Sequence, residues 1–169
     1  MKGQICAWCS AALLGAVAGG VLVKKVWRNK YQAQKAELDL TKQQYARLRA
    51  WMELARAGQH CADYFTAHNL KTAAILGMNW EGRLLADLLG ETAVYGVELD
   101  NFSAVHERMV VYRLGEDPLP EADCLVICDL DRLEQKKQLA ENAFRGKIVT
   151  LTEILEWGRL QKECASDMD

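Results

Sequence analysis

The sequence predicts an α/β fold with a five-stranded, doubly wound parallel sheet of strand order 3-2-1-4-5, preceded by a transmembrane helix and a long cytoplasmic helix. Three observations lead to this prediction. The chain opens with a long uncharged run, continues with a basic stretch, and ends with five short apolar runs separated by helical or turn-like segments. Its 169 residues allow one ordinary domain besides the N-terminal helices.

The charge distribution divides the chain into three segments. We expect an N-terminal transmembrane anchor at residues 1–23, a basic juxtamembrane helix at 24–60 and the α/β domain at 61–169. Residues 24–60 hold nine Lys or Arg and three acidic residues, whereas residues 61–169 hold 11 basic and 20 acidic residues. Because nucleic-acid binding draws much of its affinity from Lys and Arg, the acidic domain argues against a nucleic-acid partner.

The anchor is predicted from nineteen consecutive uncharged residues, Ile5 to Val23. As a helix this run is about 28 Å long, close to the roughly 30 Å of a bilayer core. Lys24 and Lys25 follow it, against Lys2 before it. The positive-inside rule therefore places the N-terminus outside and the remaining chain in the cytoplasm, with the lipid bilayer as a partner. The alternative is a cleaved secretory signal, because Ala16–Ala18 has the small-x-small form of a cleavage site.

The second segment is predicted to be helical because it contains no Pro or Gly before Gly58, where we expect the helix to end. Large apolar residues recur at a spacing of seven: Tyr31, Leu38, Tyr45 and Met52. Their partners three residues later are mixed in polarity, so both a coiled coil and a helix that folds back on the domain stay open. A homodimer through this helix and through Gly15 and Gly19, which form a G-x-x-x-G step, is one expectation.

The third segment alternates strands and helices. The predicted strands are the compact apolar runs 72–76, 93–97, 109–112, 125–128 and 148–151. Runs without polar interruption are typical of a parallel sheet covered by helices on both faces. A helix with Leu84, Leu85, Leu88 and Leu89 on one stripe is expected after the first strand, another helix precedes the last strand, and a terminal helix follows it. The connections around the third strand are too short for full helices.

A loop with two glycines follows the first predicted strand and opens the first helix. In Gly77-Met78-Asn79-Trp80-Glu81-Gly82 the outer glycines occupy the first and last positions of the G-x-G-x-x-G pattern that binds dinucleotides. Glu98 ends the second strand, at the place where an acidic side chain bonds a ribose hydroxyl in such sites. The candidate cofactor-binding residues are therefore Gly77, Met78, Asn79, Gly82 and Glu98, and the candidate ligands are NAD(P) or a sugar nucleotide.

The region from Lys71 to Trp157 resembles a Rossmann-like domain of bacterial surface-polysaccharide and sugar-nucleotide loci. The resemblance is carried by Ala74–Met78, Val97–Glu98, Asp117–Pro120 and Ile148–Leu155. It covers about half of the chain and implies the fold and a nucleotide-type crevice, without specifying a reaction. It also suggests polysaccharide-assembly proteins as partners.

The loop departs from the dinucleotide pattern at its middle glycine. Asn79 stands there, and its side chain fills space that a pyrophosphate uses, although Asn also caps helices well. Glu81 adds a carboxylate that we expect to compete with phosphate for the loop amides, and Glu98, Asp100, Asp129 and Asp131 make the crevice acidic. The favoured function is a membrane-tethered interaction or scaffold module, because no acid, base or nucleophile can be argued from the sequence; whether the protein is an enzyme stays open. The alternative is an NAD(P)- or sugar-nucleotide-binding protein or minimal enzyme that uses this loop.

Other chemical signals are weak. Asp129-Leu130-Asp131 imitates a phosphotransferase motif, but the chain that remains is too short for the rest of that site, so we interpret it as a strand end followed by a helix cap. Cys124 and Cys128 are expected in the core. Cys6 and Cys9 lie on one helix face in the anchor. The three histidines show no ligand spacing, and the sequence predicts neither catalytic residues nor a metal site.

Overall fold

The computed structural model of the chain describes residues 2–99 and 108–166, with only the backbone for residues 2–23, 162, 163, 165 and 166. The chain divides into two compact units, Met1–Gln43 and Gln44–Asp169. Each unit is described by itself. The predicted division at residue 61 differs from this one, because residues 44–60 belong to the same compact unit as the sheet.

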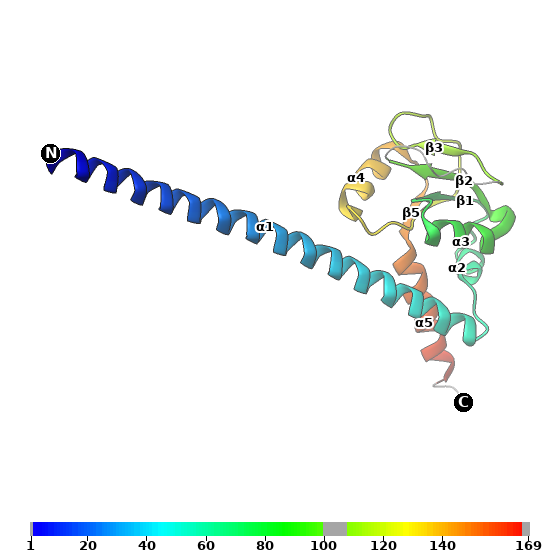
Figure 1. The fold of residues 1–169 in the computed structure, drawn as a ribbon. Coiled ribbons are helices and arrows are strands. Elements are labelled where there is room, and N and C mark those ends of the chain that lie inside the picture. Colours follow the sequence, from blue (N-terminus) through cyan, green and yellow to red (C-terminus); the bar gives the residue numbers. More distant parts are fainter. Residues whose placement is uncertain (1, 100–107, 167–169) are drawn as a thin grey trace. The chain divides into compact units, whose positions relative to one another are not determined.

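A single helix, α1, runs from Lys2 to Arg56 (Figure 1). The predicted long helix after residue 24 is confirmed as far as Arg56. Gly58 has a φ of +71°, and the amides of Gly58 and Gln59 donate to the carbonyls of Ala55 and Leu54. These are the two hydrogen bonds of a Schellman motif, which requires a residue with positive φ, so Gly58 ends the helix as its sequence position predicts.

The predicted anchor, residues 1–23, has side chains that lie outside the described residues. Within the part of the chain that the structure describes, none of the helices combines the length and the apolar character needed to span a membrane.

The second unit is built on a five-stranded sheet. Its strands are β1 (Ala73–Leu76), β2 (Ala93–Glu98), β3 (Val111–Arg113), β4 (Cys124–Ile127) and β5 (Lys147–Thr150). The order is β3-β2-β1-β4-β5 and every pair is parallel, which confirms the predicted sheet and its order. Each residue of the two central strands β1 and β4 is buried, because helices cover both faces of the sheet and leave no polar side to the strands.

Among the described residues, four helices follow α1 and accompany the sheet: α2 (Cys61–Ala67), α3 (Trp80–Leu89), α4 (Leu133–Ala143) and α5 (Leu151–Ser166), with a 3₁₀ turn, η1, at Gly90–Thr92. Alternate residues of the strands enter two separate core clusters, as the period of two requires. Ile75 and Val126 pack with residues of α2, α3 and α5, whereas Leu76 and Ile127 pack with residues of α4. In Figure 1, α3 and α4 accordingly lie on opposite sides of the sheet.

The last turns of α1 belong to the first of these clusters. Trp51 and Leu54 are buried there, at 8% and 5% exposure, and a Cβ at Gly158 of α5 would lie 2.9 Å from Leu54 Cδ2. Burial of two large side chains stabilises the unit by several kcal/mol, at about 1.5–3 kcal/mol each. This packing is the reason that the compact unit begins at Gln44.

The predicted apolar stripe on α3 is only half buried. Leu85 and Leu89 face the core, but Leu84 and Leu88 are 38% and 47% exposed. The inner face of α3 is instead completed by Gly82 and Ala86, each three or four residues from a buried leucine. Small residues at these positions let the helix lie close to the sheet. The inner face of α3 therefore consists of Gly82, Leu85, Ala86 and Leu89.

Candidate functional site

The candidate site lies where β1, β2 and β4 end. Gly77–Asn79 follows β1, Glu98 ends β2, and Cys128 and Asp129 follow β4. Since the strands are parallel, their carboxyl ends meet at one edge of the sheet, and β1 lies between β2 and β4, at the point where the strand order reverses. This is the position at which doubly wound folds bind nucleotides.

Two glycines hold the loop against its neighbours. Gly77 has a φ of +93°, and a Cβ built on it would lie 2.8 Å from Asp129 Cβ. A Cβ on Gly82 would lie 2.1 Å from the carbonyl oxygen of Gly77. Both distances are shorter than real Cβ contacts, so the loop and the first turn of α3 need glycine at these two positions.

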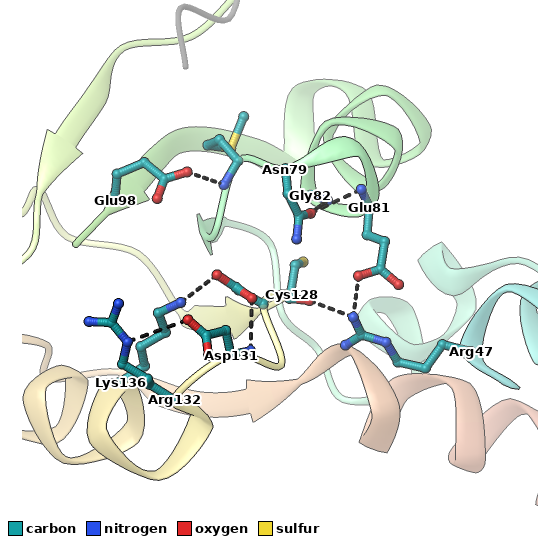
Figure 2. A network of polar contacts seen from close by, with 11 residues as sticks. Arg47, Asn79, Glu81, Gly82, Glu98, Cys128, Asp131, Arg132 and Lys136 are labelled. Carbon is teal, nitrogen blue, oxygen red and sulfur yellow. Dashed lines mark hydrogen bonds and ion pairs between the residues drawn. The ribbon is translucent and has the colours of Figure 1, made fainter. Parts of the chain in front are cut away.

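Asn79 is the N-cap of α3. Its side-chain Oδ1 accepts hydrogen bonds from the amides of Glu81 and Gly82, each at 3.0 Å (Figure 2). The helix capping that the sequence allowed for Asn79 is therefore present. Two of the amides that would bind a phosphate at this helix N-terminus already have an acceptor from the protein.

Glu98 contacts the same loop from β2. Its Oε1 accepts a hydrogen bond from the amide of Met78 at 2.6 Å. Burial raises the pKa of Glu98 above its ordinary value, against the opposing effects of the Met78 amide and the Lys136 ammonium. The structure thus brings Glu98 to the predicted loop, where its carboxylate occupies a third amide of that loop.

Glu81 points away from the loop amides. Its carboxylate is fully buried and forms an ion pair with the guanidinium of Arg47, from the last turns of α1 (Figure 2). The expectation that Glu81 competes with phosphate for the loop amides is therefore wrong, because the side chain turns toward α1. Burial raises the pKa of Glu81, and Arg47 opposes this effect.

Arg47 also donates to the carbonyl oxygen of Cys128 at 2.9 Å, so one side chain joins α1, α3 and the end of β4. Within the described part of the chain, Arg47 Nε and Glu81 Oε1 have no hydrogen-bond partner. Sequence reasoning missed Arg47, which stands in a basic helix among cations that are exposed. The only signal is its place on the helix face that carries Trp51 and Leu54.

The acidic side of the crevice has a cation that was also missed. Lys136 of α4 is 7% exposed, and its ammonium forms an ion pair with Asp129. The other oxygen of Asp129 accepts from the amide of Asp131 at 2.9 Å. This hydrogen bond closes a local turn after β4. The N-cap of α4 is Arg132, with a φ of +51°, so Asp131 is not the helix cap that we expected.

The predicted acidic crevice is thus partly neutralised by Lys136, and Asp100 lies outside the described residues. Among the described side chains, no group of His, Cys, Asp or Glu has the arrangement to hold a metal ion.

The cysteines of the core are not reactive nucleophiles. Cys61, Cys124 and Cys128 are buried, as predicted for the last two, and carry free thiols. Burial raises the pKa of Cys61 and of Cys124 to about 12, so both are protonated at neutral pH.

His68 Nδ1 lies 2.8 Å from the carbonyl oxygen of Tyr64, a local contact at the end of α2. Cys6, Cys9 and His106 lie outside the described side chains.

Comparisons of the chain with protein-family models, with curated proteins and with solved structures gave no significant match.

Proposed function

We propose that this protein is a membrane-tethered interaction module, whose nucleotide-type crevice is occupied by its own side chains. The observation that carries the proposal is the state of the loop amides: Met78 donates to Glu98, and Glu81 and Gly82 donate to Asn79. A phosphate at this helix N-terminus would need free N–H groups and space beside them. Here it would have to displace a carboxylate and a capping side chain.

The electrostatics of the loop oppose a nucleotide as well. Glu98 already occupies the amide nearest to the strand, and its charge would repel a pyrophosphate. Asp129, on the opposite side of Gly77, is 28% exposed and ion-paired to Lys136. A ligand phosphate could recruit this lysine only by separating the pair. These interactions favour a structural role for the side chains at this site. The alternative function is an NAD(P)- or sugar-nucleotide-binding site.

The tether rests on the sequence. The uncharged run 5–23 and the cations that follow it favour a single-pass anchor with the N-terminus outside. The α/β domain would then lie at the cytoplasmic face of the cell membrane, where a module without its own reaction can position other proteins. Polysaccharide-assembly proteins are the partners that the resemblance to surface-polysaccharide loci suggests.

Ligand binding and topology test the two halves of the proposal. NAD, NADP and a sugar nucleotide should cause no thermal shift of the full chain in detergent, whereas a bound ligand at 100 times its Kd would stabilise the protein by about 2.7 kcal/mol. A clear shift with one ligand contradicts the interaction module. Protease added to right-side-out vesicles should leave the α/β domain intact, and its digestion there contradicts the tether.

The variant Glu98→Ala with Asn79→Gly tests whether these side chains close the loop. It removes the acceptor from the Met78 amide and from the two α3 amides while leaving the Arg47–Glu81 pair in place. If the protein's own side chains are what exclude nucleotides, this variant should gain measurable NAD binding by calorimetry. Equal absence of binding in both proteins would mean that the crevice excludes nucleotides for another reason.

A further inference from the structure

A row of exposed apolar residues follows α1. Tyr31, Leu38, Tyr45 and Met52, which we call the heptad face, are spaced by seven residues and are 69%, 54%, 70% and 57% exposed. Single exposed apolar residues are ordinary, but a regular row of four on one helix is the pattern of a coiled-coil seam. None of these four residues belongs to either core cluster of the described chain.

Cations flank the heptad face on one side. The residue four positions after each member of the face is basic and exposed: Lys35, Lys42, Arg49 and Arg56. In coiled coils this position faces the charged residues of the partner helix and decides which partner is accepted. Lys42 and Arg49 have acidic neighbours on their own helix, Asp39 at 3.9 Å and Glu53 at 2.8 Å. Exposed pairs of this kind contribute little and exchange readily.

The other side of the face is partly closed by the protein itself. Within the Gln44–Asp169 unit, Gln44 is half-buried and Trp51 is 8% exposed in the core, and each precedes a member of the heptad face by one residue. A partner on Tyr45 and Met52 therefore approaches from the side of Arg49 and Arg56. Charge on this side then has more influence on partner choice than in a symmetric coiled coil.

We propose that the heptad face binds an acidic amphipathic helix of another protein as a heterotypic coiled coil. This inference rests on the proposed interaction module and names the chemistry of its partner. Acidic residues on the partner helix would meet the row of four cations, and its apolar residues would cover the heptad face. The positions three residues later are mixed in polarity, since Gln34 and Thr41 are polar while Leu48 and Ala55 are apolar, and such a seam suits a moderate and exchangeable association.

A second copy of this chain fits the face poorly. In a parallel pair, residues 35, 42 and 49 of one helix meet residues 30, 37 and 44 of the other. Lys35 would then meet Lys30, and Arg49 would meet uncharged Gln44, so only Lys42 with Glu37 is attractive. In an antiparallel pair the two rows of cations meet each other. Both arrangements lack the charge complementarity that an acidic helix supplies.

An anionic lipid surface fits poorly as well. Along a helix that rises about 1.5 Å per residue, Leu38 already lies roughly 21 Å beyond Lys24, the first cation after the predicted anchor. Screening at physiological salt limits surface attraction to about 8 Å. Lipid headgroups could therefore attract the first cations of the helix but not the whole heptad face of a helix that leaves the bilayer.

The test uses the full chain in nanodiscs of neutral lipid and two synthetic helical peptides. Both peptides carry leucine heptads, one with Glu and one with Lys at the positions that flank the seam. We expect calorimetry to detect binding of the Glu peptide, weakening as salt rises, and no binding of the Lys peptide. Equal binding of the two peptides, or no binding of either, would overturn the proposal.

Two matched variants locate the contact. Lys35→Gln with Lys42→Gln should weaken Glu-peptide binding about fivefold, whereas Ala36→Glu with Gln43→Glu makes the same change in net charge on another exposed face and should leave binding nearly unchanged. Leu38→Ala should weaken binding about tenfold, with circular dichroism showing that the helix remains. Equal effects of the two charge variants would overturn the heptad face as the site.

Two further outcomes would assign the heptad face to a second copy of the chain or to a lipid surface. A stable dimer of the full chain, lost in Leu38→Ala, would assign the face to a second copy. Binding to phosphatidylserine nanodiscs that is lost in Lys35→Gln with Lys42→Gln would assign it to lipid. Both outcomes overturn the acidic-helix proposal. They leave the nucleotide screen unaffected, so a failure here is distinguishable from a failure of the interaction module itself.

Discussion

Arg47 of α1 and Glu81 of α3 form a buried ion pair, although they are far apart in the sequence. The same guanidinium donates to the carbonyl of Cys128, so the end of the long helix is bonded to the edge of the sheet where β4 finishes. Two charges that leave water cost several kcal/mol unless each has the other. The pair therefore makes the last turns of α1 a required part of the α/β unit.

Substitution of Arg47→Met should destabilise the second unit by about 3–5 kcal/mol, because Glu81 is left buried without its cation. Glu81→Ala should have a similar effect, since it leaves Arg47 unpaired. Urea unfolding of the full chain in detergent, followed by near-UV circular dichroism, measures both. The double substitution Arg47→Met with Glu81→Leu should recover most of the loss. A double variant as unstable as the sum of the singles would contradict this account.

A fragment that begins at Gln44 should unfold cooperatively, and one that begins at residue 61 should be much less stable. The shorter fragment lacks Trp51 and Leu54, worth about 1.5–3 kcal/mol each when buried, and it leaves Glu81 unpaired. This total approaches the 5–15 kcal/mol of a whole domain. Matched urea titrations of the two fragments test it. Equal midpoints would restore the expectation from sequence that residues 61–169 fold alone.

Gly77→Ala should destabilise the protein by about 3 kcal/mol, and Gly90→Ala by only about 1 kcal/mol. Both glycines have positive φ, at +93° and +56°, which residues with a Cβ rarely adopt, so both substitutions meet backbone strain. Only at Gly77 does the new Cβ also overlap Asp129, whereas the space at Gly90 is open. Thermal unfolding of the two variants separates strain from overlap. Identical losses would mean that the loop can move away from β4.

Acid should remove a contribution of Asp123 to stability. The amides of Lys71 and Thr72 donate to its carboxylate and hold its pKa below the ordinary value. A carboxyl with a lowered folded-state pKa stabilises the fold above its unfolded pKa of about 3.9, and this stabilisation is lost as pH falls toward the folded value. The midpoint of thermal unfolding should therefore fall more between pH 5 and pH 3, roughly the window that this pKa sets, in wild type than in Asp123→Asn.

Glu121→Gln is the control for this pH dependence. Its exposed carboxylate lies on the same loop and accepts no hydrogen bond within the described part of the chain. The thermal-unfolding midpoint of this control should depend on pH as that of wild type does. A pH profile of Asp123→Asn that coincides with wild type would show that the amides of Lys71 and Thr72 do not hold the charged form.

The candidate site was only partly predictable. The sequence placed five candidate residues at one edge of the sheet: Gly77, Met78, Asn79, Gly82 and Glu98. The first four lie in the loop and helix start that follow one apolar run, Glu98 ends the next run, and parallel strands bring such positions together. It did not predict which amide each side chain would bond. Arg47 was missed because it stands in a helix with many similar cations, and Lys136 because it stands beside Lys137; which cation is buried depends on how the helix packs.

The sequence by itself determined the sheet, its order and the long helix. Periodicity, uninterrupted apolar runs and glycine positions can be read from each segment's own residues, and they indicate where helices and strands begin and end and which of their faces are buried. Tertiary structure alone decided that α1 enters the core, that Glu81 turns to Arg47, and that Glu98 accepts a hydrogen bond from the Met78 amide. These outcomes depend on desolvation. A buried charge or polar group must pair with a group that the packing brings within hydrogen-bond distance, and the local sequence does not determine which groups come that close.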